Sequence, residues 1–163
     1  MQTLNSEALD DYLKWREMVF SVTRAQVEDG PDQPDRVYGV IMDVGLSNDF
    51  VISITAFATG ESSLRTTVGG GAIGLGSDPF IAGQAKQIVI LAQSLLKTTR
   101  RMNHHHLPQG KEVYFYFLTP DGLILTESTV EETYSQTHPF HEMFSRFTAI
   151  KARSEELLKG SRH

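Results

Sequence analysis

The sequence contains no cysteine, and this absence excludes several kinds of chemistry. Without thiols the chain has no disulfide, no thiolate nucleophile and no cysteine-ligated zinc or iron–sulfur site. No stretch approaches the ~18 apolar residues of a membrane helix, and the first residues lack the basic and apolar regions of a signal peptide. Basic residues are outnumbered, 15 against 20 acidic ones, for a formal net charge of −5. We therefore expect a cytoplasmic protein that binds neither nucleic acid nor membrane.

The composition is typical of one folded domain. The chain has 163 residues, of which 40% are hydrophobic and 21% charged, and this length suffices for a single buried core. Two polar connections stand out within it, an acidic, proline-containing loop at 28–36 and a histidine, proline and glycine loop at 103–111. Neither has the length or composition of an interdomain linker, so we expect one domain over 1–163.

Hydrophobic periodicity and turn residues predict an α+β fold with the element order α-β-β-β-α-β-β-α. The five strands form an antiparallel sheet, and the helices pack on it. Helices are predicted at 6–25, from 78 to about 96, and from Pro139 onward. Strands are predicted at 37–46, 50–58, 63–68, 112–118 and 123–127.

The middle helix is the most apolar segment of the chain. Asp78 is a favourable N-cap and Pro79 suits the first helical position. Apolar residues recur along it at helical spacing, and Ile90 and Leu91 fall outside that stripe. The sequence therefore predicts a helix that is buried on more than one side.

The strands predict two kinds of sheet face. In the segment 112–118, Val113 and Phe115 alternate with Tyr114 and Tyr116, so both faces are apolar. Such a strand either lies centrally in a covered sheet or presents one aromatic face to a partner. Asp43 interrupts the apolar segment 40–44. A carboxylate in such a strand points to solvent or needs a partner, and we expect it to face solvent.

In element order and size this layout resembles that of the roadblock, longin and profilin-like modules. Together with its acidity it also resembles the small chaperones of bacterial type III secretion. The resemblance concerns layout alone and implies no site residues.

A run of glycines, Gly69, Gly70, Gly71, Gly74 and Gly76, separates the third strand from the middle helix. The segment 69–74 matches G-x-G-x-x-G, but the helix starts later than in a dinucleotide site, and no acidic residue lies ~20 positions further on. One interpretation is a tight connection into which no side chain fits. The other is a ligand site whose backbone N–H groups bind an anion or a partner chain.

Six histidines are the remaining candidates for chemistry. His138 and His141 are spaced three apart and predict part of a weak transition-metal site. Neither H-E-x-x-H nor H-x-x-E-H is present. His104, His105 and His106 are interpreted as a polar surface loop. We predict no cofactor.

No catalytic residue is assigned, because the sequence has no nucleophile elbow and its acids fall mainly at turns, caps and strand ends. The first hypothesis is a non-catalytic protein-binding module, of the adaptor, chaperone or immunity type, that binds a protein partner or a second copy. The alternative is a small-molecule or nucleotide sensor that uses the Gly69–Gly76 loop. A histidine-dependent enzyme is the third.

Overall fold

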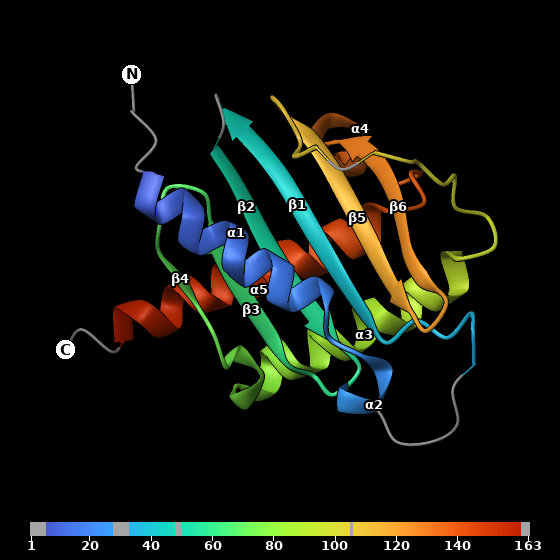
Figure 1. Ribbon diagram of the computed structural model, residues 1–163, viewed down its shortest axis with the longest axis horizontal. Coiled ribbons are helices and arrows are strands. Elements are labelled where there is room, and N and C mark those ends of the chain that lie inside the picture. The colour runs from blue at the N-terminus through green and yellow to red at the C-terminus, as the bar shows by residue number, and fades with distance from the viewer. Residues whose placement is uncertain (1–5, 28–32, 48–49, 105, 161–163) are drawn as a thin grey trace.

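A six-stranded antiparallel sheet forms the centre of the computed structural model (Figure 1), with the strand order β4-β3-β2-β1-β5-β6. The structure describes residues 6–27, 33–47, 50–104 and 106–160; part of the predicted acidic loop, the turn residues Asn48 and Asp49, and His105 lie outside them. The strands are β1 (Gly39–Ser47), β2 (Phe50–Phe57), β3 (Ser62–Thr66), β4 (Gly71–Ala72), β5 (Glu112–Thr119) and β6 (Gly122–Thr129). The predicted fold class and element order are confirmed.

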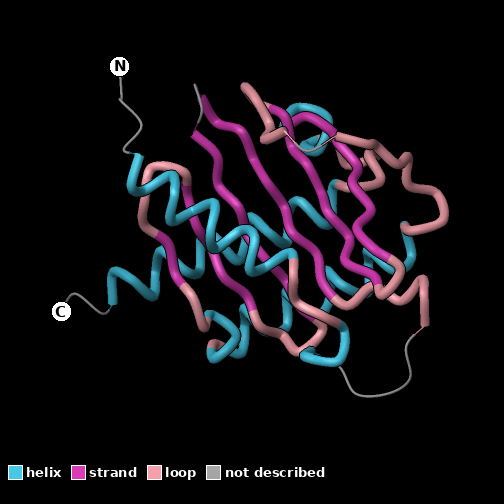
Figure 2. The backbone as a smooth tube through the Cα atoms, viewed as in Figure 1, coloured by secondary structure: helices cyan, strands magenta, loops and turns pink. Residues whose placement is uncertain are grey.

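Helices cover both faces of the sheet, which gives three layers (Figures 1 and 2). Helix α1 (Ser6–Phe20) crosses the front face in the view of Figure 1, while α3 (Pro79–Leu95) and α5 (His141–Gly160) lie side by side behind the sheet. Three short helices complete the fold: α2 (Arg24–Val27), the 3₁₀ helix η1 (Leu75–Ser77) and α4 (Val130–Tyr134). No helix of the described residues is long and apolar enough to span a membrane.

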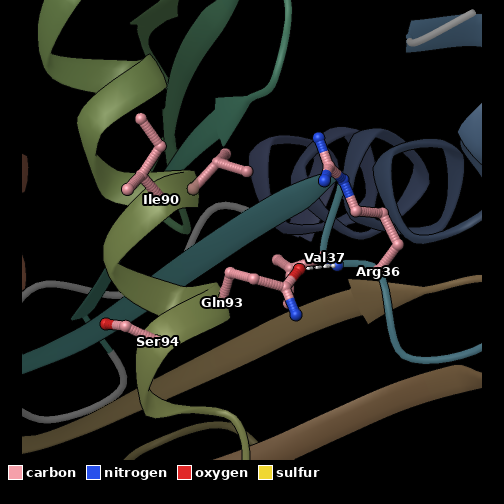
Figure 3. A pocket seen from close by; sticks show the side chains of 6 residues that line it. Arg36, Val37, Ile90, Gln93 and Ser94 are labelled. Carbon is pink, nitrogen blue, oxygen red and sulfur yellow. Dashed lines mark hydrogen bonds between the residues drawn. The ribbon is translucent and has the colours of Figure 1, made fainter.

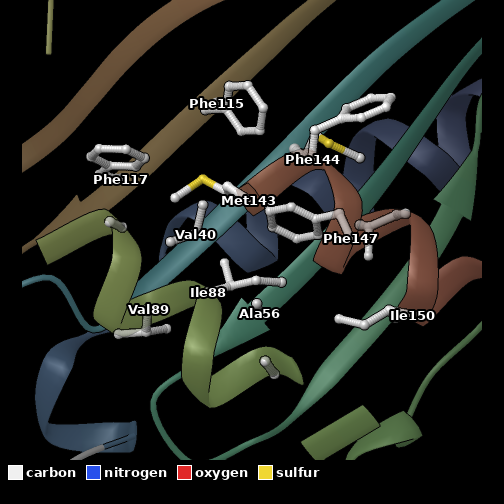
Figure 4. Close-up of a cluster of buried hydrophobic side chains, with 14 of the residues drawn as sticks. Val40, Ala56, Ile88, Val89, Phe115, Phe117, Met143, Phe144, Phe147 and Ile150 are labelled. Carbon is white, nitrogen blue, oxygen red and sulfur yellow. The ribbon is translucent and has the colours of Figure 1, made fainter. Parts of the chain in front are cut away.

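The main core lies between the sheet and the two rear helices (Figure 4). Alternate residues of β5, Val113, Phe115 and Phe117, face this layer and are completely buried. Phe147 of α5 and Ile88 of α3 meet them from the helix side and are also completely buried. The predicted alternation of β5 is therefore correct, because a strand places successive side chains on opposite faces.

Helix α1 closes a second, smaller apolar cluster on the front face. It buries Tyr12, Trp15 and Val19, whereas Leu13, which helical spacing predicts on the same apolar stripe, is 42% exposed. The helix also ends at Phe20 instead of continuing to residue 25. The side chains that contact the sheet thus differ in part from those that the sequence predicted.

Helix α3 begins as predicted and is less buried than predicted. The Asp78 side chain accepts a hydrogen bond from the Ile81 N–H at 3.2 Å, as an N-cap does. Arg153 of α5 donates to the same carboxylate, and this bond holds the pKa of Asp78 below its usual range. Ile90, however, is 59% exposed, because α5 covers the helix on one flank and leaves its outer face in solvent.

Two short segments that the sequence did not predict border the sheet. Strand β4 pairs with β3 through Leu64 and Arg65, directly after the glycine turn. On the other edge the Met102 N–H donates to the Leu125 carbonyl of β6 at 2.7 Å. Both segments are too short to show a period of their own in the sequence.

Candidate functional site

A buried ion pair joins α1 to the middle of the sheet. Asp43 of β1 has no exposed surface, and its carboxylate accepts from Arg16 of α1 at 2.8 Å, with a second contact at 2.7 Å. The Arg16 guanidinium also lies 4.7 Å from the ring centre of Phe20 and 5.2 Å from that of Tyr116. The expectation that Asp43 faces solvent is therefore wrong: a cation supplied by another element satisfies its charge.

Two hydroxyl groups complete this network. Ser53, opposite Asp43 in the β1–β2 register, donates to the carboxylate at 2.6 Å, and the Tyr12 hydroxyl lies 2.6 Å from the Ser53 hydroxyl. Burial, together with the nearby Asp43 charge, raises the pKa of Tyr12 to about 12. The phenol therefore stays protonated at neutral pH, and the four side chains form one hydrogen-bonded network beneath α1. This arrangement fixes the position of the helix.

The turn between β3 and β4 carries Gly69 and Gly70, which help to line a cavity of about 190 Å³. The same cavity is lined by Glu7 and Asp11 of α1 and by Arg65 of β3. Two carboxylates therefore face one guanidinium, a charge balance that disfavours a phosphate. The structure brings these two glycines to a hollow, but its charge does not suit the nucleotide ligand that the sequence suggested.

Two other glycines of the run, Gly71 and Gly76, allow close backbone packing, and Gly74 supplies a left-handed backbone. A Cβ at Gly71 would lie 2.1 Å from the Leu64 carbonyl oxygen, and one at Gly76 would lie 2.7 Å from the Gly60 carbonyl oxygen. The Gly76 N–H already donates to the Glu61 carboxylate at 3.0 Å. Gly74, the N-cap of η1, has a left-handed backbone with φ of 68°. These features favour the interpretation of the glycine run as a tight connection, and they disfavour its interpretation as an anion site.

His138 and His141 have separate local partners. The His138 Nδ1 accepts from the Phe140 N–H at 3.1 Å, and the His141 Nδ1 donates to the Thr133 carbonyl at 2.8 Å. Within the described residues, no three histidine, aspartate or glutamate side chains are arranged to hold a metal ion. Metal binding at this pair stays a prediction. The hydrogen bonds of the two histidines explain them as residues that order the chain where α5 begins.

The loop interpreted from the sequence as polar surface brings two histidines against the end of the sheet. The rings of His104 and His106 stack with their centres 3.9 Å apart, and the His104 Nε2 lies 2.9 Å from the Glu127 carboxylate of β6. The buried Tyr114 hydroxyl donates to Glu112 at 3.2 Å and lies 3.2 Å from the His106 Nδ1. The run of histidines was the available signal, but which ring meets Glu127 or Tyr114 depends on long-range packing that the local sequence does not encode.

A hollow of about 350 Å³ opens beside the outer surface of α3 (Figure 3). Ile90, Gln93 and Ser94 of α3 line one side, and Arg36 and Val37, which precede β1, line the other. The Gln93 side chain accepts from the Val37 N–H at 2.8 Å and donates to the Asp35 carbonyl at 3.0 Å. Gln93 thereby fixes the wall of the hollow, while Ile90 stands exposed at its side.

The same helix borders a second hollow near its first turn. Phe80 is 48% exposed and lines a depression of about 410 Å³ together with Ala149, Ala152 and Arg153 of α5. The ten residues from Phe80 to Ile90 correspond to roughly 15 Å of helix. Two large apolar side chains therefore stand exposed along one helix, each beside a hollow.

Comparison with known families, characterised proteins and solved structures finds no match for this chain. No relative supplies an activity, a ligand or a site residue that could be carried over. The resemblance of layout to the roadblock, longin and profilin-like modules and to the secretion chaperones stays a prediction.

Proposed function

We propose that this chain is a non-catalytic protein-binding module whose partner docks on the outer surface of α3 and α5. The observation that carries the proposal is the pair of exposed apolar side chains on α3, Ile90 at 59% and Phe80 at 48%, each beside a hollow. Exposed apolar residues that border concave surface are typical of interfaces, whereas isolated ones need no explanation. One hollow lies between α3 and the segment before β1, and the other lies between α3 and α5.

The polar groups that come together elsewhere also favour binding over catalysis. Arg16 and Asp43 satisfy each other beneath α1, and the Tyr114 hydroxyl is engaged by a carboxylate. Such groups are already committed to hydrogen bonds within the fold, so they offer no free acid, base or nucleophile to a substrate. The glycine turn, lined by more carboxylates than cations, gives little support to a nucleotide sensor.

Affinity capture from the source cells tests the proposal. The tagged chain should retain a stoichiometric protein partner, and the Ile90→Asp variant should lose it, because a buried carboxylate without a partner disfavours the complex. Leu13→Asp is the matched control, since Leu13 is 42% exposed on α1 at the opposite face of the sheet.

Retention of the partner by Ile90→Asp would place the interface elsewhere on the molecule. If the wild-type chain elutes alone and light scattering shows a monomer, the binding-module function itself is refuted. Thermal unfolding of both variants checks that each one folds.

A further inference from the structure

An apolar cavity of about 230 Å³ lies between α4, α5 and the end of the β1–β2 hairpin. Met42, Val44 and Ile52 of the sheet line it on one side, and Tyr134 of α4 and Phe144 of α5 line it on the other. The three sheet residues are buried, so the strands present a continuous hydrocarbon surface here. This cavity is separate from the hollows along α3, since it shares no lining residue with them.

The side chains around the cavity remain partly in solvent although they are large and apolar. Tyr134 is 68% exposed and Leu46 is 45% exposed. The Tyr134 ring stands edge-on to Phe144, with the ring centres 5.7 Å apart and the planes at 76°. A concave apolar surface with a few polar groups beside it is the usual form of a small-molecule site.

The lining of this cavity also includes one positively charged side chain. Lys151 of α5 lines the cavity, and its ammonium group pairs with Glu155 on the next turn of the helix at 2.6 Å. Both side chains are substantially exposed, at 39% and 53%, and an ion pair of this kind is weak because water screens it. Lys151 can therefore exchange Glu155 for the carboxylate of a ligand.

We propose that this cavity binds a medium-chain monocarboxylate, with its hydrocarbon chain against the sheet and its carboxylate at Lys151. The volume of about 230 Å³ corresponds to roughly seven or eight groups of the size of a water molecule or a methylene. It is smaller than the ~300–1,000 Å³ pockets that take drug-sized ligands. Octanoate matches both the volume and the single positive charge.

Calorimetric titration of the 163-residue chain with octanoate, octan-1-ol and octyltrimethylammonium tests this site. One octanoate should bind per chain, at least about tenfold more tightly than the cationic analogue, because Lys151 attracts one charge and repels the other. Lys151→Gln should weaken octanoate binding about tenfold. Lys159→Gln, which removes the same charge from the last turn of α5, is the matched control and should leave binding unchanged.

Thr148→Phe tests the position of the hydrocarbon chain. Thr148 lines the cavity, and its hydroxyl donates to the Phe144 carbonyl of its own helix, so the larger side chain fills the cavity and removes just one local hydrogen bond. This variant should abolish octanoate binding while its thermal unfolding stays cooperative.

Three results would overturn the proposal: no heat with octanoate up to about 1 mM, equal affinity for the three head groups, or undiminished binding by Thr148→Phe. If Thr148→Phe releases a captured protein while octanoate gives no heat, the cavity receives a side chain of that partner, and the proposal is wrong. The proposed partner surface on α3 can stand or fall independently, because its test uses Ile90→Asp.

Discussion

Asp43 holds a charge in the middle of a buried strand because two side chains bind it and a third supports them. Arg16 reaches it from α1, Ser53 from the neighbouring strand, and Tyr12 contacts Ser53. The sequence around Asp43 shows an apolar strand with one acid, and its partner lies 27 residues earlier in a helix. A pairing across such a distance leaves no periodic signal, so its position could not be derived from the local pattern.

Removal of the Arg16 charge should strongly destabilise the folded chain. We expect Arg16→Met to lower the free energy of unfolding by about 3–5 kcal/mol, because it leaves a buried carboxylate without its cation. The double variant Arg16→Met with Asp43→Asn should lose less than the sum of the single losses. Urea denaturation of the three variants measures the coupling.

Arg146→Met provides the comparison for this pair. Arg146 forms a partly exposed ion pair with Glu142 of the same helix, and such pairs contribute at most about 1 kcal/mol. Additive losses in the Arg16 and Asp43 cycle would show that the two charges do not stabilise α1 through each other.

Helix α3 shows how far local patterns define an element. Asp78 and Pro79 correctly predicted its start, and the apolar spacing correctly placed Ile81, Ala85 and Ile88 in the core. The exposure of Ile90 did not follow from the sequence, because it depends on how much of α3 is covered by α5. The same limit applies to β4, a two-residue strand that exists through its pairing with β3.

Gly83 allows a test of how local sequence contributes to the stability of α3. It lies on the exposed face of α3, and a Cβ there would meet no atom within 4 Å. Gly83→Ala should therefore raise the free energy of unfolding by about 0.5–1 kcal/mol, because alanine loses less backbone entropy in a helix. Chemical denaturation at constant m-value measures the gain.

Gly76→Ala is the matched substitution in the same region. Its Cβ would lie 2.7 Å from the Gly60 carbonyl oxygen, so this variant should be less stable than the wild type. If Gly83→Ala also destabilises the chain, the outer face of α3 is covered by something other than water.

At the scale of the whole molecule, the two faces of the sheet are covered unequally. Helices α3 and α5 each bury five residues against the rear face, whereas α1 buries three against the front. The element order and the antiparallel sheet were predicted correctly, since each of the longer strands and helices has its own period. Which helices cover which face of the sheet did not follow from the sequence, because it depends on long-range packing.

This inequality predicts the order in which the molecule opens. Amide hydrogens in α1 should exchange through a local opening at lower free energy than those of β1 and β5 in the centre of the sheet. Hydrogen exchange followed by mass spectrometry of peptides from each element measures the difference. Equal protection of α1 and β5 would instead show that the front layer opens only with the whole domain.

The two borders of the sheet have a consequence for behaviour at high concentration. An uncovered border strand is a template for aggregation, because its free N–H and C=O groups can recruit another chain. Here two-residue β4 occupies the border of β3, and Met102 takes the Leu125 carbonyl of β6. These pairings occupy Leu64 and Arg65 of β3 and Leu125 of β6, so at those positions the borders have no free backbone groups with which a second chain could begin a new strand.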